Sequence, residues 1–325
     1  MRFPQIHRFL VAMFVLSLAF GAFATAHAGN LHRVPRDYAT IQEAVDAAEA
    51  GDTIRVGPGE YAGATITKRL ELKGSGAGTR IISGVWFQGG GPYDTSFFIE
   101  PEAAGTIISH FVLVNGNFPH VFGVFARETD FVTISHLTIL SSWQGITNNG
   151  GNYWTIIHNK IEGFPQDSDS ATGIYLPADR ANLEGNFVAL NTIDFSDGIG
   201  DVSNGIMMVT FEESWVGMST GNSFVHNTIK ANETGFTTAS FGISLLFADY
   251  TGGLSPLTLV DNIASFNDCR DNNIPIDLYC WPEDPACVQA LADSNEIVGN
   301  LGDVENRSGV SDPDINPRDF RPNMP

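Results

Sequence analysis

Ile156-Ile157-His158-Asn159-Lys160-Ile161 is one copy of the six-residue cassette that decides the fold of this chain. Each cassette has an apolar residue, two variable positions, a slot that settles on asparagine, one spacer and a second apolar residue. Six copies occur, beginning at Ile108, Ile134, Ile156, Val188, Phe224 and Leu259. The fourth slot advances by 26, 22, 32, 36 and 35 residues from copy to copy. Repetition on this scale predicts a solenoid, in which each repeat buries its apolar face against its neighbours.

A second repeated feature, a glycine followed by an apolar residue, lies between the cassettes. Its copies are Gly123-Val124, Gly145-Ile146, Gly173-Ile174, Gly205-Ile206 and Gly242-Ile243. Each repeat therefore holds three short extended segments, which around the third cassette are 155–157, 160–163 and 173–176. They are too short for helices and rich in Ile, Tyr and Leu, a pattern typical of strands.

The asparagine slot predicts a tight corner between two strands. Asn tolerates a positive φ and hydrogen-bonds locally, so we expect this slot to adopt that conformation. Asn159, Asn191, Asn227 and Asn262 should then stack, with their amides hydrogen-bonded along the solenoid axis.

The N-terminal part of the chain predicts one helix that caps the solenoid. Thr40 and Glu43 form a capping box, and Gly51 stands where a helix C-cap belongs. The apolar stripe of this helix comprises Ile41, Ala44, Val45 and Ala48. Such a helix covers the terminal apolar layer, which an open solenoid exposes.

With the segments Val34–Ala48, Gly51–Val56 and Pro58–Tyr61, the cassettes resemble the right-handed parallel β-helix proteins of the pectate-lyase-like superfamily. The resemblance covers about Val34 to Asn262. It implies an all-β fold, a right-handed parallel β-helix (solenoid) with an N-terminal capping helix. It also implies that an active cleft runs along the sheet that begins at the glycine-apolar pairs.

The two ends of the chain carry different signals. Arg2 and Arg8 precede an apolar run, and Ala26-His27-Ala28 is a small-x-small cleavage site, so we expect a secretory signal peptide and a secreted or periplasmic protein. No later stretch has the apolar length of a membrane span. The expected organisation is 1–28 signal peptide, 29–64 cap helix and first coil, 65–301 β-helix repeats, and 302–325 C-terminal tail.

The net charge of the chain limits the classes of ligand it can bind, and its three cysteines limit the disulfides it can form. The chain has 17 basic and 37 acidic residues, a net charge of −20, and loss of Arg2 and Arg8 with the signal makes it −22. Nucleic acid is an unfavourable partner, and a polyuronate would need bridging Ca²⁺. Cys269, Cys280 and Cys287 allow one disulfide in an oxidising compartment, with the pairing left open.

Strand alternation selects the outward residues of the sheet implied as the cleft. It predicts a largely apolar groove floor in which Phe125, Tyr175 and Met207 contact substrate, with Arg127 and Arg180 beside them. Acids cluster in the bordering loops, and two of them 6.5–9.5 Å apart would suit an inverting glycoside hydrolase. The candidate catalytic acids are Asp194, Asp197, Asp201, Glu212 and Glu213.

Two further chemistries remain open. A lyase needs a base such as Arg127, Arg180 or Lys160, with Ca²⁺ as a possible cofactor. His110, His136 and His158 share the third cassette slot, so their imidazoles should stack about 4.8 Å apart. They form either a metal site or a surface ladder without metal.

The leading hypothesis is a secreted protein that binds or cleaves an extracellular carbohydrate, as a polysaccharide lyase or glycoside hydrolase if it is an enzyme. The alternative is a non-catalytic structural or surface-adhesion scaffold. A concave groove holding two carboxylates would favour the enzyme. Loops packed over the sheet would favour the scaffold.

Overall fold

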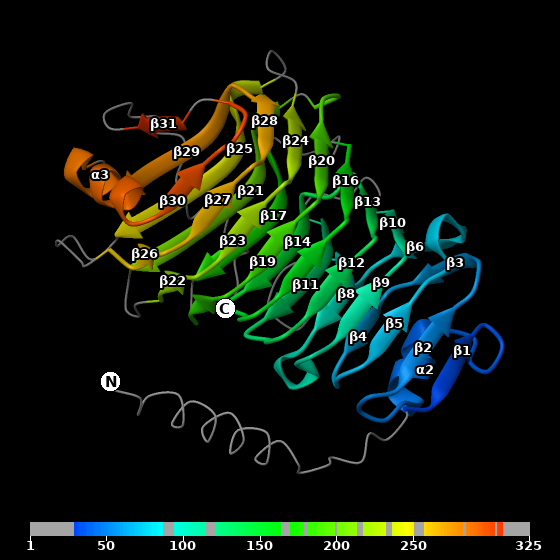
Figure 1. Ribbon diagram of the computed structural model, residues 1–325. Coiled ribbons are helices and arrows are strands. Elements are labelled where there is room, and N and C mark those ends of the chain that lie inside the picture. Colours follow the sequence, from blue (N-terminus) through cyan, green and yellow to red (C-terminus); the bar gives the residue numbers. More distant parts are fainter. Residues whose placement is uncertain are drawn as a thin grey trace, which may run out of the picture.

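The computed structural model describes residues 29–86, 94–114, 121–163, 170–178, 181–198, 200–212, 217–231, 236–249, 257–281, 284–302 and 304–307. Its strands stack in register along one axis, so that the chain winds through parallel sheets coil after coil (Figure 1). The right-handed parallel β-helix predicted from the cassettes, and implied by the resemblance to the pectate-lyase-like superfamily, is confirmed.

Three long sheets run along the axis. The first, before the asparagine corner, contains β1 (Leu31–Val34), β2 (Thr53–Val56), β5 (Glu71–Lys73), β9 (Ile107–Ser109), β12 (Thr133–Ser135), β15 (Thr155–Ile157), β19 (Phe187–Ala189), β23 (Ser223–Val225), β27 (Ile263–Ser265) and β30 (Glu296–Val298). The second, after that corner, contains β3 (Gly59–Ala62), β6 (Thr79–Ser83), β10 (Val112–Val114), β13 (Thr138–Leu140), β16 (Lys160–Glu162), β20 (Thr192–Phe195), β24 (Thr228–Ala231) and β28 (Asp268–Asp271).

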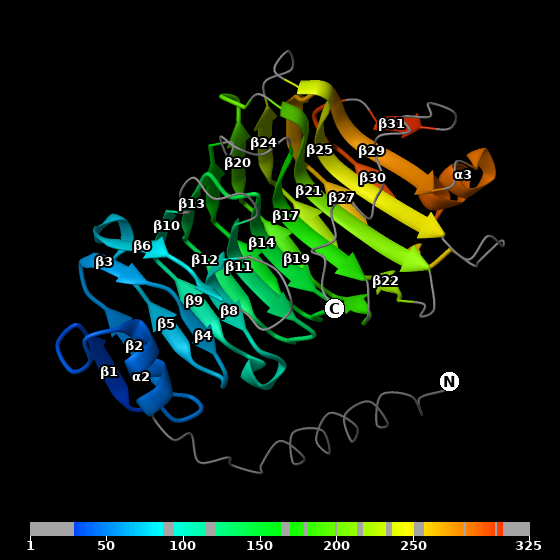
Figure 2. The same cartoon turned by 180° about the vertical axis from the view of Figure 1, so that it is seen from behind.

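The third sheet holds the glycine-apolar pairs, and its strands lengthen toward the C-terminal half (Figure 2). It contains β4 (Ala64–Ile66), β8 (Asp94–Ile99), β11 (Val121–Arg127), β14 (Gln144–Asn149), β17 (Ser170–Ala178), β21 (Gly200–Glu212), β25 (Phe236–Asp249), β29 (Ile274–Trp281) and β31 (Val304–Arg307). The remaining elements are β7 (Val85–Trp86), antiparallel to β8, a small sheet of β18 (Leu183–Glu184), β22 (Ser219–Thr220) and β26 (Leu259–Val260), and the 3-10 turns η1 (Gly76–Gly78) and η2 (Pro101–Ala103).

The inward side chains of the three long sheets form one continuous core. In each coil the apolar cassette residues point into it, as Ile156 on β15 and Ile161 on β16 do. The glycine column has a packing reason, because a Cβ on Gly173 would lie 2.6 Å from the Gly205 carbonyl oxygen and 2.8 Å from Ile193 Cδ1. Neighbouring coils can approach this closely only where the side chain is absent.

The asparagine corner differs from the prediction in one respect. Positive φ occurs at the third cassette slot, as at His158 (54°), and not at the asparagine that follows it. Asn159 is instead buried, and its amide donates to Asn191 Oδ1 at 3.0 Å and to the Ile134 carbonyl at 3.0 Å. The prediction of a hydrogen-bonded asparagine stack is correct, but the conformational reason given for it is wrong.

The sixth cassette lies five residues later than the sequence pattern predicts. The ladder from Asn159 continues through Asn191 and Asn227 to Asn267 and Asn300, so that Asn267 is the equivalent of Asn227. Asn262 belongs to a second ladder at another corner. That ladder runs through Asn186, Asn222, Asn262 and Asn295. Both corners therefore have buried amides whose polar atoms bond from coil to coil, which satisfies the backbone groups that a turn leaves unpaired.

The N-terminal end is closed by α2 (Ile41–Ala47), with the predicted capping box between Thr40 and Glu43. The helix ends at Ala47 with Ala48 as its C-cap, so Gly51 does not have that role. Lys68 from the next coil donates to the Val45 and Ala48 carbonyls at 3.1 and 2.9 Å. Since these carbonyls have no partner within the helix, this cation satisfies them and suits the negative helix end.

The C-terminal end carries a second helix, α3 (Pro285–Asp293), within the range 65–301 that was expected to hold β-helix repeats. Its Val288 and Leu291 enter the main core, and a disulfide joins Cys280 on β29 to Cys287. Cys269 is the free, buried thiol. Strand pairing continues beyond the last core coil through β31 to Arg307.

Candidate functional site

The outward face of the third sheet, where the sequence analysis places a groove floor, is buried. Phe125, Tyr175 and Met207 do share one outward column, as predicted from alternation. All three are shielded from solvent. They pack into two apolar clusters separate from the main core, one containing Phe125 and the other Tyr175 and Met207. The expectation of an open aromatic platform is therefore wrong, because these side chains form additional small cores.

A polar strip crosses this face between the two apolar clusters. Its members lie on β14, β17 and β21 in the outward columns of the sheet, and all are buried: Gln144, Thr147, Asn149, Thr172 and Asn204. Every member is an amide or a hydroxyl, and none carries a charge. Within the strip the Thr147 hydroxyl donates to Gln144 Oε1 at 2.6 Å.

Asn204 has the most unusual environment in the polar strip. Its side chain is 1% exposed, yet among the described residues neither Oδ1 nor Nδ2 has a hydrogen-bond partner. The Asn149 Oδ1 atom on the same face is also buried without one. Buried polar groups in folded proteins nearly always have partners, because an unpaired one retains its full desolvation penalty. A buried amide with neither end paired therefore calls for an explanation, and a bound water molecule or ion is one.

The acids predicted as one catalytic set are spread over separate places. Asp194 lies on the outward side of β20, beside Glu162 and Lys230, and its carboxylate accepts from the Ser196 backbone N–H at 3.1 Å. Asp197 is exposed in the turn that follows β20.

Asp201 and Glu212 stand at opposite ends of β21. A strand rises about 3.3 Å per residue, which separates them by about 36 Å along the strand. Glu213 lies outside the described residues. The distance rules out joint action of Asp201 and Glu212. It arises because β21 is thirteen residues long, a strand length that local sequence patterns do not predict.

Two carboxylates on this sheet were missed from the sequence. Asp277 on β29 is buried in the same outward column as Met207 and Ser244. Asp249 is opposite Glu212 in the β21–β25 register and is nearly buried. Asp277 is not predicted as a site residue, because the sixth cassette is predicted five residues too early and the segment that forms β29 is then not predicted to be a strand of a coil.

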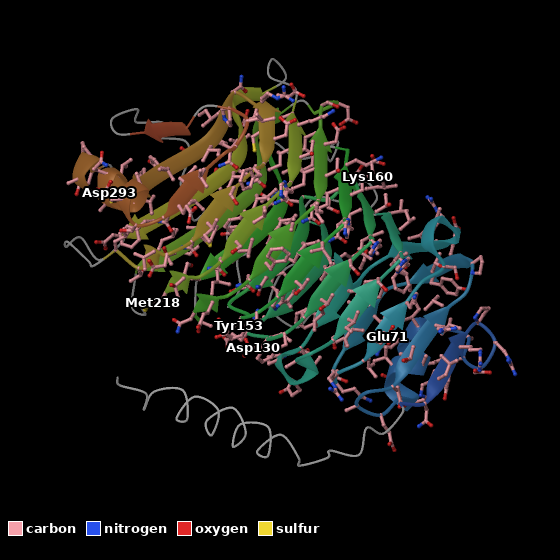
Figure 3. The ribbon with its side chains drawn as sticks, in the orientation of Figure 1. Glu71, Asp130, Tyr153, Lys160, Met218 and Asp293 are labelled. Carbon is pink, nitrogen blue, oxygen red and sulfur yellow. A yellow bond between two sulfur atoms is a disulfide. The ribbon has the colours of Figure 1, made fainter. Side chains whose placement is uncertain are left out.

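The predicted basic residues also separate. Arg127 is half-buried at the end of β11, opposite Asn149. Glu100 lies near it, and the pKa of that carboxyl is raised by burial and by Glu102, with Arg127 acting in the opposite direction. Lys160 lies on β16 of the second sheet, paired with Glu162 (Figure 3), whereas the polar strip lies on the third sheet. Arg180 lies outside the described residues.

The predicted imidazole stack is present at the asparagine corner. The ring centroids of His110 and His136 are 4.8 Å apart, and those of His136 and His158 are 5.2 Å apart. The rings stack face to face, which points their nitrogen lone pairs in parallel directions and not at a common point. No cluster of three or more metal-ligating side chains occurs in the described part of the chain. Burial, together with His136 and Lys73, lowers the pKa of His110.

A stacked aromatic pair occupies the other corner. Phe131 and Tyr153 have ring centroids 5.2 Å apart and are 58% and 44% exposed. Tyr153 lies close to Asp130 on the surface (Figure 3). A hydrogen bond to Glu184, with burial and the nearby carboxylates, raises the pKa of the Tyr153 hydroxyl.

Comparisons with known proteins do not assign a function to this site. No family model matches the chain, and no curated protein matches it. Among solved structures, the Geobacillus virus E2 protein ORF18 aligns over 92% of this chain and 63% of its own length, with 10% identity and a TM-score of 0.39. This chain thus spans less than two thirds of that viral protein.

Two further solved structures with a similar chain course are those of enzymes. A pectin methylesterase bound to a hexasaccharide aligns over 86% of this chain and 90% of its own, with 11% identity and a TM-score of 0.37. The DFA-IIIase of Arthrobacter chlorophenolicus A6 without its lid aligns over 84% and 99%, with 13% identity and a TM-score of 0.38. TM-scores this low decide nothing about the present chain, whose β-helix is established by its own strand pairing. Within the described residues, no helix has the length and apolar character of a membrane span.

Proposed function

We propose that the protein binds an extracellular carbohydrate through the polar strip on the outward face of the third sheet. The observation that supports this most strongly is the buried, unpaired amide of Asn204. An amide offers one acceptor and two donor positions, the combination that sugar hydroxyls pair with. Apolar clusters containing Phe125 and Tyr175 border the strip on its two sides.

The proposal favours a neutral carbohydrate. The members of the polar strip are uncharged, while the chain carries a net charge of −20 that repels acidic polymers. A site built to hydrogen-bond hydroxyls also discriminates strongly against ligands that lack them, because its own polar groups then stay unpaired. Entry of the ligand requires this buried face to open.

The decisive experiment uses two variants of the same strand with opposite expectations for binding. Asn204→Leu removes the unpaired amide, so we expect unchanged or higher thermal stability together with loss of binding to neutral polysaccharides. Thr210→Val is the matched control, because its hydroxyl is likewise buried without a described partner but points into the main core. It should gain stability and retain binding. Affinity electrophoresis against a panel of neutral polysaccharides measures the binding.

Two results would reject the proposal. If no neutral polysaccharide retards the wild-type protein, the polar strip is not a carbohydrate site and the scaffold hypothesis is favoured, in agreement with the burial of this face. If Asn204→Leu lowers stability by more than about 1 kcal/mol, the amide is satisfied in the native state and the physical argument fails.

Cleavage is a second candidate, supported by one juxtaposition. Glu212 and Asp249 are opposite each other on adjacent strands, which are about 4.8 Å apart. The register brings the two residues to neighbouring strands, and most glycoside hydrolases act through a pair of carboxyl groups. Release of reducing ends from the polysaccharide panel, abolished by Asp249→Asn with binding retained, would establish it. Binding without release in the wild-type protein would reject it.

A further inference from the structure

A pocket at the N-terminal end of the β-helix carries a charge opposite to that of the whole protein. It has a volume of about 500 Å³ and is lined by residues of β1, β2 and β5 and of the segments that follow them. These are the first strands of the first sheet, drawn in blue in Figure 1. Its charged lining residues are Arg33, Arg36, Arg55 and Lys73, and no Asp or Glu lines it. The volume falls in the range of small-molecule sites.

Strand register holds three of these cations in one row. Arg33 is opposite Arg55, and Arg55 is opposite Lys73, on successive parallel strands about 4.8 Å apart. Like charges at directly opposite positions destabilise a sheet. The row therefore costs stability in the absence of an anion, and an anion placed against it relieves that repulsion.

Few carboxylates neutralise this row. Asp37 approaches Arg33 at 3.8 Å and Arg36 at 3.5 Å, long separations between largely exposed groups. Arg55 and Lys73 form no ion pair with any described residue. Four of the 17 basic residues thus converge on one pocket in a chain with 37 acids. A local positive potential within a negative surface attracts and orients anionic ligands.

The chemistry of the side chains selects the anion. Three guanidinium groups offer planar pairs of donors that match the oxygens of a phosphate, and an ammonium group adds a further cation. A phosphate monoester carries nearly two negative charges at neutral pH, so it gains more from this row than a single carboxylate does. A neutral sugar cannot use the charges at all.

We propose that this pocket binds a phosphate monoester group, such as that of a phosphorylated saccharide. The site is separate from the polar strip on the third sheet, and its ligand differs in charge. The proposal therefore stands or falls independently of neutral-carbohydrate binding.

Isothermal titration calorimetry tests the pocket with four probes, namely inorganic phosphate, glucose 6-phosphate, glucuronate and glucose. We expect the two phosphate compounds to bind more tightly than glucuronate and glucose to give no heat of binding. Tighter binding of glucose 6-phosphate than of inorganic phosphate would assign the sugar a contact, and equal binding would limit the site to the phosphate group. Affinity should fall as NaCl is added.

Two double variants with the same loss of charge locate the site. Arg55→Gln with Lys73→Gln removes two pocket cations and should weaken phosphate binding about tenfold or more. Arg80→Gln with Lys160→Gln removes one arginine and one lysine from the second sheet and should change the affinity about twofold or less. Equal losses in the two variants, or no phosphate binding by the folded wild-type protein at millimolar concentrations, would overturn the assignment. Circular dichroism confirms that each variant is folded.

Discussion

Substitution of Asn227 by alanine tests whether the asparagine ladder holds the coils together. Asn227 occupies the middle of the ladder and is 1% exposed. Its Oδ1 accepts from the Asn191 backbone N–H at 3.1 Å and from Asn191 Nδ2 at 2.9 Å. Its Nδ2 donates to the Val188 carbonyl at 2.9 Å and to Asn267 Oδ1 at 3.0 Å. One side chain thus connects three successive coils.

The expected cost follows from the groups that Asn227→Ala leaves behind. The Asn191 N–H loses its acceptor, and the Val188 carbonyl loses its side-chain donor, both in the buried interior. A buried polar group without a partner costs about 1–3 kcal/mol, so the two together predict a loss of about 2–6 kcal/mol in the free energy of unfolding. A value near the middle of this range exceeds the cost of most surface substitutions several-fold.

Asn300→Ala is the matched control, because Asn300 makes the same kinds of bond at the end of the ladder. Its Oδ1 accepts from Asn267 N and Nδ2, both at 2.9 Å, and its Nδ2 donates to the Ala264 carbonyl at 2.7 Å. Asn300 is only partly buried, so water can replace the lost bonds, and the cost should stay near 1 kcal/mol.

Urea denaturation followed by circular dichroism at pH 7 measures both costs, provided that the slope m is unchanged between variants. A loss in Asn227→Ala no larger than that in Asn300→Ala would refute the argument that burial makes these bonds essential. Loss of cooperativity in Asn227→Ala alone would instead show that the two halves of the solenoid have become independent.

Four further predictions concern charge and thiol chemistry. Burial opposes ionisation of Asp52, but hydrogen bonds, including those from backbone N–H groups, outweigh it and lower the pKa below the ordinary 3.8. The stabilisation that the Asp52 carboxylate contributes is therefore complete above about pH 4 and is lost as the pH falls below that value. Asp52→Asn should cost about 2–4 kcal/mol at pH 7 and flatten the acid limb of a stability-versus-pH curve, and an unchanged acid limb would contradict this. The pKa of His110 is lowered below its ordinary 6.5, so the unfolded chain binds the proton more readily and stability should decline as the pH falls below 6.5. His110→Asn, which suits the positive φ of 62° at this position, should reduce that decline in urea titrations at pH 7.5 and 5.5. Reduction of the Cys280–Cys287 disulfide, whose cysteines are seven residues apart, should cost about 2.5 kcal/mol by the loop-entropy relation, measurable as a lower Tm in reductant. Burial raises the pKa of Cys269 to about 12, so this thiol should resist alkylation until the protein unfolds, and rapid labelling of the native protein would contradict its burial.

The sequence predicted the repeat, the strands of most coils and the capping helix because each depends on short-range patterns. Apolar residues at the cassette ends must point into the core whatever the rest of the coil does, as Ile156 and Ile161 illustrate. The pattern became misleading where two asparagine ladders run in parallel. Asn262 and Asn267 both sit in cassette-like surroundings, and only the coil-to-coil hydrogen bonds assign each to its ladder.

The candidate site was much less predictable. Alternation correctly placed Phe125, Tyr175 and Met207 outward, but it carries no information about what packs over a sheet, and all three are buried. It also gave no strand lengths, so Asp201 and Glu212 were grouped although a whole strand separates them. Asn204 attracted no attention as one polar residue in a polar stretch. Its significance arises from burial without a partner, which is a property of its surroundings.

The sequence by itself therefore determined that the chain coils, where it turns and which side chains face the axis, because those features repeat with the local chemistry of each coil. Only the tertiary structure decided which outward residues are covered, which carboxylates are neighbours, and that Arg33, Arg55 and Lys73 form a row. These residues are far enough apart in the chain that no local pattern links them. Stacking of coils at strand spacing brings them together, and the register of that stacking depends on every loop length between them.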